Sequence, residues 1–515
     1  MAVGGAVRFG EFELDIGSGE LRRRGRRIGL GPQPLKILTA LVAAPGEIVS
    51  REALCQRIWG EGTFVDFEHG LNFCIREIRS KLGDHAKRPR FIETIPRRGY
   101  RFIAGICAVS SNGSASPKEI QLHEIYVQAR ASLNQSGKES LEEARRLFEQ
   151  VITLDPNYAM AHAGLGAAYA LRNINRRDPE DLKSAHFHLR KALELDAELA
   201  EPYPWLCYVY VRLGQLEDAI KAGHQGVKLL PDLVQAQYFL GMTYLSSTEW
   251  GADNYQVAAG HLLRATLIAP RWQASWFGLS YIALLTGDYV RAREFGGHLL
   301  PTPGITVEVP FLGGEHALAS VEMRQGEWKQ ARRILLGFLE RMKTSDHMYR
   351  DTMSAAAACI LGEVYIREGA IEHALASYHR AWHILQEHRR IMGHARLCVR
   401  AQAGLALAYA SQGDRERATG LLSKGIEMAD ASTSISHCVP VVSLAEQFYA
   451  IAVAHIGLGA LKDAMCALRR AAVSGWRDAQ WLRRDPLLEP VRRSPEFDGI
   501  VDSAARFPPV RFVAD

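Results

Sequence analysis

A recurrent pattern of small, aromatic and apolar residues runs through residues 120–475. The intervals between successive copies are 41, 34, 39, 34, 39, 43, 44 and 46 residues. Spacing of this size is typical of helix pairs that stack into a solenoid, because a single pair cannot bury its own apolar face. A small residue lets the two helices of each pair approach closely, and it marks nine expected pairs at Ala144, Ala185, Ala219, Ala258, Ala292, Ala331, Ala374, Ala418 and Ala464.

Two copies show the pattern most clearly, "WLCYVYVRLGQLEDAIKAGHQGVKLLPD" at residues 205–232 and "ILGEVYIREGAIEHALASYHRAW" at residues 360–382. They resemble tetratricopeptide (TPR) repeats, whose period is 34 residues. The resemblance implies a superhelix whose concave face binds a peptide or a protein partner, and a small-molecule effector is also possible there. Residues 120–475 are therefore expected to form a TPR-like array. Residues 476–515 no longer fit the repeat, and we expect them to cap its end.

The first fifth of the chain differs from the rest in charge. Residues 1–104 hold 18 Lys and Arg against 12 Asp and Glu, whereas residues 105–515 hold 44 against 45. A basic excess confined to one segment indicates a polyanionic partner for that segment, with a merely solvated basic face as the alternative. Residues 107–119, "CAVSSNGSASPKE", are rich in Ser and lack periodicity, so we expect a flexible linker between the two parts.

Short alternating runs over residues 6–30, bounded by Gly and Ser, predict a small antiparallel sheet. Helical spacing then predicts one helix over residues 32–44 and a second over residues 51–60, with Ser50 as its N-cap. A third helix is predicted over residues 66–82. Its apolar positions form one stripe, Leu71, Ile75, Ile78 and Leu82. The opposite side carries Phe73, Arg76 and Ser80, while Asn72 and Arg79 lie on one flank and Glu77 on the other.

After Gly83, "RFIETIP" and "YRFIAG" read as two strands joined by a tight turn that carries arginine. Taken in order, "FGEFELD", "IREIRSKLGD" and "RPRFIETIPRRGYRF" resemble the OmpR-type winged helix-turn-helix domain. The resemblance covers residues 7 to about 104 and implies a DNA-binding function. The fold class expected for the whole chain is an α+β winged helix-turn-helix domain, residues 1–106, followed by an all-α TPR-like solenoid.

The resemblance implies that helix 66–82 reads the major groove, a role for which a basic helix face is suited. Arg76 and Arg79 match positions where the family presents arginine to DNA, and Phe73 is placed to contact a thymine methyl group. Glu77 departs from a frequent arginine; in the groove it would accept a hydrogen bond from cytosine. For the arginines, phosphate contact or simple solvation stays open.

The wing, residues 91–103, is expected near the minor groove. Trp59 and Tyr100 match positions that touch phosphate, and a role in the core is the alternative for both. Pro96 stands where the family often has arginine, and Arg97 and Arg98 follow it. The expected DNA-contacting residues are Trp59, Asn72, Phe73, Arg76, Glu77, Arg79, Thr94, Arg97, Arg98 and Tyr100.

Other chemistries find little support in the sequence. No GxxxxGK[ST], GxSxG or HExxH motif occurs, so we expect neither an enzyme nor a bound cofactor. The eight cysteines have no zinc-type spacing, and the histidines between residues 379 and 394 lie on a repeat helix, where surface or packing roles are expected, so we expect no metal site. No export signal or membrane span is apparent, which favours a cytoplasmic protein.

The sequence thus predicts a bacterial, sequence-specific transcription regulator that binds double-stranded DNA and is regulated through its repeats. The competing hypothesis is a protein-interaction scaffold, in which the winged helix binds protein or tethers the chain to DNA without sequence preference.

Overall fold

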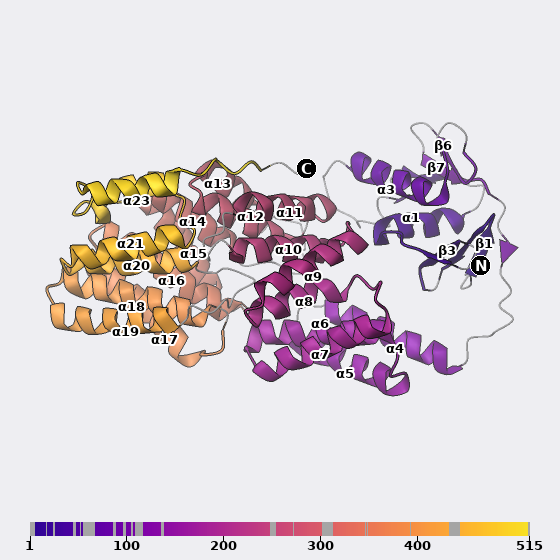
Figure 1. Cartoon of the computed structure of the whole chain (residues 1–515), viewed down its shortest axis with the longest axis horizontal. Coiled ribbons are helices and arrows are strands. Elements are labelled where there is room, and N and C mark those ends of the chain that lie inside the picture. The colour runs from indigo at the N-terminus through magenta and orange to yellow at the C-terminus, as the bar shows by residue number, and fades with distance from the viewer. Residues whose placement is uncertain are drawn as a thin grey trace. The chain divides into compact units, whose positions relative to one another are not determined.

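A computed structural model of the 515-residue chain forms two compact units, which are described separately below (Figure 1). The first contains residues 1–121 with 303–306, and the second contains residues 122–302 with 307–515. The structure describes residues 6–16, 18–23, 26–44, 48–51, 53–54, 67–85, 89–95, 99–104, 107–108, 117–134, 138–247, 254–270, 272–300, 313–345, 347, 349–391, 393–431 and 443–512.

The first unit opens with an antiparallel sheet. Four strands follow one another by short turns: β1 (Ala6–Phe9), β2 (Phe12–Asp15), β3 (Glu20–Arg23) and β4 (Arg26–Ile28). The order in the sheet is β4-β3-β2-β1-β8, because β8 (Cys107–Ala108) pairs with β1. The expected linker at 107–119 is therefore wrong at both ends: its first two residues are a strand, and helix α4 begins at Pro117.

A second sheet of the first unit contains the wing. Strands β6 (Ile92–Ile95) and β7 (Gly99–Phe102) pair antiparallel, and β5 (Ile48–Ser50) adds to the other edge of β7. Strand β5 was not expected from the sequence. The Ser50 hydroxyl accepts the amide hydrogen of Ala53 at 3.1 Å, as an N-cap does. Most of the second expected helix lies outside the described residues.

Helices α1 (Pro32–Val42) and α3 (Phe67–Leu82) pack together over the sheets. The predicted stripe of α3 is confirmed, since Leu71, Ile75, Ile78 and Leu82 are each at most 2% exposed. Strand side chains complete the core with aromatic rings in edge-to-face contact; the Phe9 and Phe102 centroids, for example, lie 5.1 Å apart. One face of α3 is thus buried in the core, and the opposite face is exposed to solvent.

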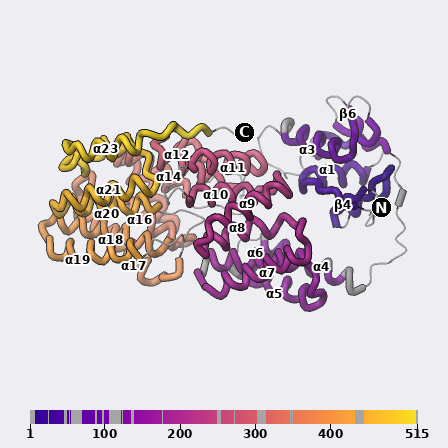
Figure 2. Tube along the Cα trace, viewed as in Figure 1, coloured from indigo at the N-terminus to yellow at the C-terminus, as the bar shows by residue number. Residues whose placement is uncertain are grey.

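The second unit is built from helix pairs that follow one another along the chain (Figure 2). The pairs are α4 (Pro117–Asn134) with α5 (Lys138–Leu154), α6 (Ala159–Arg176) with α7 (Pro179–Leu195), α8 (Pro202–Arg212) with α9 (Leu216–Leu229), α10 (Val234–Ser247) with α11 (Tyr255–Ile268), α12 (Gln273–Leu285) with α13 (Tyr289–Gly297), α14 (Gly314–Arg324) with α15 (Trp328–Arg341), α16 (Arg350–Arg367) with α17 (Ile371–Glu387), α18 (His394–Ser411) with α19 (Arg415–Ala431), and α20 (Leu444–Gly457) with α21 (Leu461–Val473).

The alanines that marked the repeats are central to this packing. All nine lie in the second helix of a pair, and each is completely buried. A larger side chain at these positions would hold the two helices apart, which explains why the sequence places alanine at each crossing. The TPR-like solenoid predicted from the sequence is therefore confirmed.

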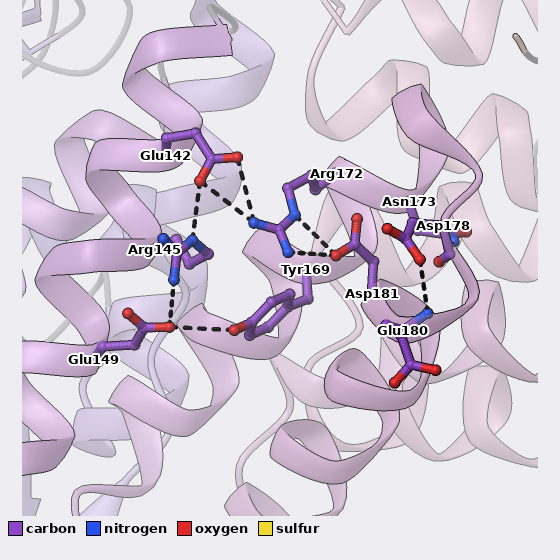
Figure 3. Close-up of polar contacts among 9 residues, drawn as sticks. All are labelled: Glu142, Arg145, Glu149, Tyr169, Arg172, Asn173, Asp178, Glu180 and Asp181. Atoms are coloured by element: carbon purple, nitrogen blue, oxygen red, sulfur yellow. Dashed lines mark hydrogen bonds and ion pairs between the residues drawn. The ribbon is translucent and has the colours of Figure 1, made fainter. Parts of the chain in front are cut away.

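Polar contacts also connect neighbouring repeats (Figure 3). Arg172 in α6 pairs with the buried carboxylate of Asp181 in α7 at 2.5 Å, and it reaches Glu142 in α5 at 3.3 Å. Glu142 also pairs with Arg145 on its own helix. One guanidinium thus links the first pair to both helices of the second, with geometry that a shift between the pairs would break.

The last segment consists of α22 (Ala479–Arg484), the 3-10 turn η2 (Pro486–Leu488) and α23 (Pro495–Ala505). Helix α23 packs against α21, beside which it lies in Figure 1, and η2 packs against α20. The segment before α23 also contacts helices much earlier in the array, as described below. Among the described residues, no helix is both long and apolar enough to cross a membrane.

Candidate nucleic-acid interface

The exposed face of α3 is the starting point for the site. Phe73 is 44% exposed, and Arg76 and Ser80 are also exposed, on the side opposite the buried stripe. The guanidinium of Arg76 has no hydrogen-bond or ion-pair partner among the described residues. An uncompensated cation and an apolar ring on one helix face are available to a ligand.

Arg79, one helical turn from Arg76, points to the wing instead. Its Nη2 atom donates to the carbonyl oxygen of Ile92 and to Oγ1 of Thr94, both at 2.8 Å. The two acceptors belong to β6, so this side chain connects the exposed helix to the first wing strand. Arg79 and Thr94 therefore hold the two expected DNA-reading elements in one orientation.

Glu77 occupies the other flank of α3 and faces α1. Its Oε1 atom accepts a hydrogen bond from the amide of Gly31, the N-cap residue of α1, at 3.1 Å. A carboxylate is favoured at this position, because the start of a helix carries partial positive charge. The expectation that this carboxylate reaches into a DNA groove does not agree with its placement against α1.

Tyr100 joins three elements of the unit. Its ring is only 3% exposed, and its hydroxyl donates to Oδ1 of Asn72 in α3 at 2.9 Å. The same hydroxyl accepts from Nη1 of Arg51 at 2.9 Å, and that guanidinium lies 5.3 Å from the ring centroid. Asn72 Oδ1 also accepts from Arg51 Nη2 at 3.0 Å. Of the two roles considered for Tyr100, the core position agrees with this geometry.

Asp84 fixes the entry to the wing just after α3 ends. Its buried carboxylate accepts backbone amide hydrogens from Arg90 at 2.6 Å and from Ile92 at 2.9 Å. Together with Arg51 and Tyr100, it lines a shallow concavity between α3 and the wing, to which Arg76 and Arg79 also contribute. The concavity therefore has three arginines on its walls and a carboxylate whose lone pairs are already used by backbone amides.

A basic helix face beside a two-stranded wing is the arrangement of a winged helix-turn-helix. Residues 25–102 match the family described as "Transcriptional regulatory protein, C terminal". The first unit is an OmpR-type winged-helix domain.

Two curated relatives match this chain over about 100 residues. The transcriptional regulatory protein CseB of Streptomyces coelicolor is 34% identical over 101 residues, which cover 20% of this chain and 41% of CseB. The transcriptional regulator HilA of Salmonella typhimurium is 34% identical over 102 residues, covering 20% of this chain and 18% of HilA. The chain thus spans less than half the length of these curated relatives.

A solved structure of the same kind is the Klebsiella pneumoniae RstA DNA-binding domain in complex with the RstA box. It is 26% identical, covers 19% of this chain and 96% of that one, and has a TM-score of 0.18.

Two residues important to the winged-helix domain were not among the sequence predictions. Arg51 was assigned only to the first turn of a helix, and Asp84 only to the end of "SKLGD". Gly83, with φ +62°, ends α3 and turns the chain so that the next carboxylate meets the wing amides. The Gly-Asp pair that follows the helix is the sequence feature from which the role of Asp84 could have been predicted. No local signal points to Arg51, because its partners are 21 and 49 residues away.

Trp59, Arg97 and Arg98 lie outside the described residues, and so does Pro96. The roles expected for them stay predictions.

Proposed function

We propose that this protein is a sequence-specific DNA-binding transcription regulator that inserts α3 into the major groove. The observation that carries the proposal is the unpaired, exposed Arg76 on the face of α3 opposite the core, as seen among the described residues. The major groove of B-DNA admits an α-helix, and a guanidinium on such a helix binds O6 and N7 of guanine with two hydrogen bonds.

Within α3, base reading is assigned to Arg76 and Phe73. The exposed ring of Phe73 lies three positions before Arg76, on the same face, where it would contact a thymine methyl group. Arg79, Glu77 and Asn72 make contacts inside the domain, so their proposed role is to position α3 and the wing.

The wing is proposed to lie along the minor groove or the phosphates next to the helix. Its strands are tied to α3 through Arg79 and Tyr100, which supports simultaneous contact by both elements. Arg97 and Arg98 would supply positive charge at the wing turn, and Trp59 a phosphate contact.

The repeat array is proposed to be the input module, regulated by a peptide, protein partner or small effector. What supports this role is the array's length and its stacked pairs, since solenoids present extended binding surfaces.

The proposal is tested by selecting duplexes from a randomised DNA library with the full chain. We expect one motif to be enriched. Arg76→Ala should lower the preference for it by about 1–3 kcal/mol per lost base contact. Lys81→Ala is the matched control, an exposed cation in the last turn of the same helix; it should weaken binding to all sequences alike.

Salt titration separates contacts to phosphates from contacts to bases, because only phosphate contacts release counterions. The logarithm of the binding constant should fall with the logarithm of salt concentration by about 0.9 per phosphate neutralised. If no motif is enriched and Arg76→Ala binds like the wild-type chain, the scaffold hypothesis replaces the regulator.

A further inference from the structure

The segment that follows the last repeat does not only cover its end. The chain turns at Gly475, whose carbonyl accepts a hydrogen bond from the hydroxyl of Tyr255 in α11, 220 positions earlier, at 2.6 Å. The amide of Arg477 then donates to the carbonyl of Leu285 in α12 at 3.1 Å. The segment therefore runs back over helices from the middle of the array.

Two carboxylates of this segment bind two arginines of the array. Asp478 accepts from Nη1 of Arg324, the last residue of α14, at 2.9 Å. Asp485 makes a two-point ion pair with Arg367, the last residue of α16, at 2.6 and 3.1 Å. Both carboxylates are completely buried, and the two guanidinium groups are almost entirely buried.

Each arginine also faces a tryptophan of the same segment. The guanidinium of Arg324 lies 5.0 Å from the ring centroid of Trp476, and that of Arg367 lies 5.0 Å from Trp481. A buried cation over an indole ring is attracted by the ring quadrupole in addition to the carboxylate. The segment thus presents one tryptophan and one aspartate to each arginine.

The two arginines occupy the same position in successive repeats. Arg324 stands two residues before Gly326, and Arg367 two residues before Gly369; both glycines have positive φ in the turn between the helices of a pair. The aspartates that they bind are seven residues apart. Each of the two repeats thus binds one aspartate of the segment. A solenoid can bind an extended segment in this way, with one contact per repeat.

Tyrosines of the array complete both carboxylate sites. The hydroxyl of Tyr289 donates to Asp478 at 2.7 Å, and the hydroxyl of Tyr449 donates to Asp485. Burial and the nearby Asp478 raise the pKa of Tyr289, so its hydroxyl keeps the proton that it donates. The array therefore supplies a cation and a hydroxyl donor to each buried aspartate.

We propose that α13, α14, α16 and α20 form a binding site for a peptide that carries paired aspartate and tryptophan side chains, and that the chain's own residues 475–488 occupy it. This inference rests on the proposed role of the repeats as the input module and names the peptide class that this part of the array accepts. While the segment is bound, the site is closed to other peptides, because a tethered ligand acts at an effective concentration on the order of millimolar.

The test uses a fluorescent peptide with the sequence of residues 474–492 and the full chain carrying Asp478→Asn and Asp485→Asn. The variant keeps the array's arginines but weakens its own segment, since a buried guanidinium that loses its carboxylate is strongly destabilised. We expect the peptide to bind the variant about tenfold or more tightly than it binds the wild-type chain. A peptide with both aspartates replaced by asparagine should not bind.

Asp181→Asn is the matched control, because Asp181 forms a buried ion pair with Arg172 elsewhere in the array (Figure 3). It should not create a peptide site. The proposal is overturned if the fluorescent peptide binds this control as tightly as it binds the double variant. It is also overturned if the double variant has the circular dichroism spectrum of the wild-type chain but does not bind the peptide.

Hydrogen exchange of the wild-type chain decides the matter if the double variant does not fold. The amides of Trp481 and Leu487 bond to the side chains of Asp478 and Asp485. A bound ligand segment opens without unfolding the array, so these amides should be on the order of tenfold less protected than those inside α16 and α18. Equal protection would make the segment an integral part of the core. Neither result depends on DNA binding, which the duplex selection measures separately.

Discussion

The hydroxyl of Tyr100 in the wing lies 2.9 Å from Oδ1 of Asn72 in the helix proposed to read DNA. The contact spans 28 residues of chain and is completed by Arg51, which binds both partners. The orientation of the helix relative to the wing thus depends on a hydrogen-bonded group of three side chains within the domain.

Tyr100→Phe removes this hydroxyl and leaves the ring in place. We expect the free energy of unfolding to fall by about 1 kcal/mol, the usual net value of such a hydrogen bond. DNA affinity should fall by a similar factor for every sequence, because Arg76 is untouched. Chemical denaturation and binding to matched and mismatched duplexes measure the two effects. A changed base preference would mean that Tyr100 itself reads DNA.

Glu77→Gln keeps the shape of a side chain that binds the amide of Gly31. The amide oxygen still accepts, so stability should fall by no more than about 1 kcal/mol, the loss of a charge-assisted bond near a helix start. The selected DNA motif should stay the same. If instead one position of the motif loses its preference for cytosine, the carboxylate contacts DNA and the contact with α1 is secondary.

Gly404 in α18 packs directly on the ring of Tyr378, and a Cβ atom there would lie as close as 2.2 Å to the ring. Gly362 in α16, which belongs to the same helix pair as Tyr378, approaches the same ring. Gly404→Ala should therefore lower the free energy of unfolding by about 1–3 kcal/mol through overpacking.

Gly420→Ala is the comparison for Gly404→Ala. Gly420 is exposed in α19, and a Cβ atom added there would meet no other atom within 4 Å. Alanine should raise stability there by about 0.5–1 kcal/mol, because it has the higher helix propensity. Urea denaturation of both variants is the measurement; equal effects at the two positions would contradict the packing argument.

His316 in α14 is buried, and burial lowers the pKa of its imidazole to about 4. Its Nε2 lies 2.7 Å from the carbonyl oxygen of Met353. Below about pH 6.5 the unfolded chain gains a proton that the folded chain does not, so the free energy of unfolding falls as the pH drops from about 6.5 towards 4.

His316→Gln should remove this contribution. Relative to the wild-type chain, the loss of stability between about pH 7 and about pH 5 should shrink by about 2 kcal/mol. Denaturant titrations at the two pH values measure the difference. An unchanged slope in His316→Gln would mean that other groups cause the pH dependence.

Local periodicity was sufficient for several elements of the fold. The stripe of α3 from Leu71 to Leu82, the two wing strands and the nine buried alanines all repeat at helix or strand spacing, and burial follows from that spacing. Strands β5 and β8 were not found, because two or three residues are too few to show alternation.

The exposed position of Arg76 was likewise predictable, since it lies opposite an apolar stripe on one helix. The partners of Arg79, Glu77 and Tyr100 were not, because they come from other elements and are brought together only when α1, α3 and the wing pack. The ion pair of Arg367 with Asp485 is a stronger case, because its members are 118 positions apart in the sequence. Its residues carry no periodic signal, and only the tertiary packing of the last segment against earlier helices determines that they meet.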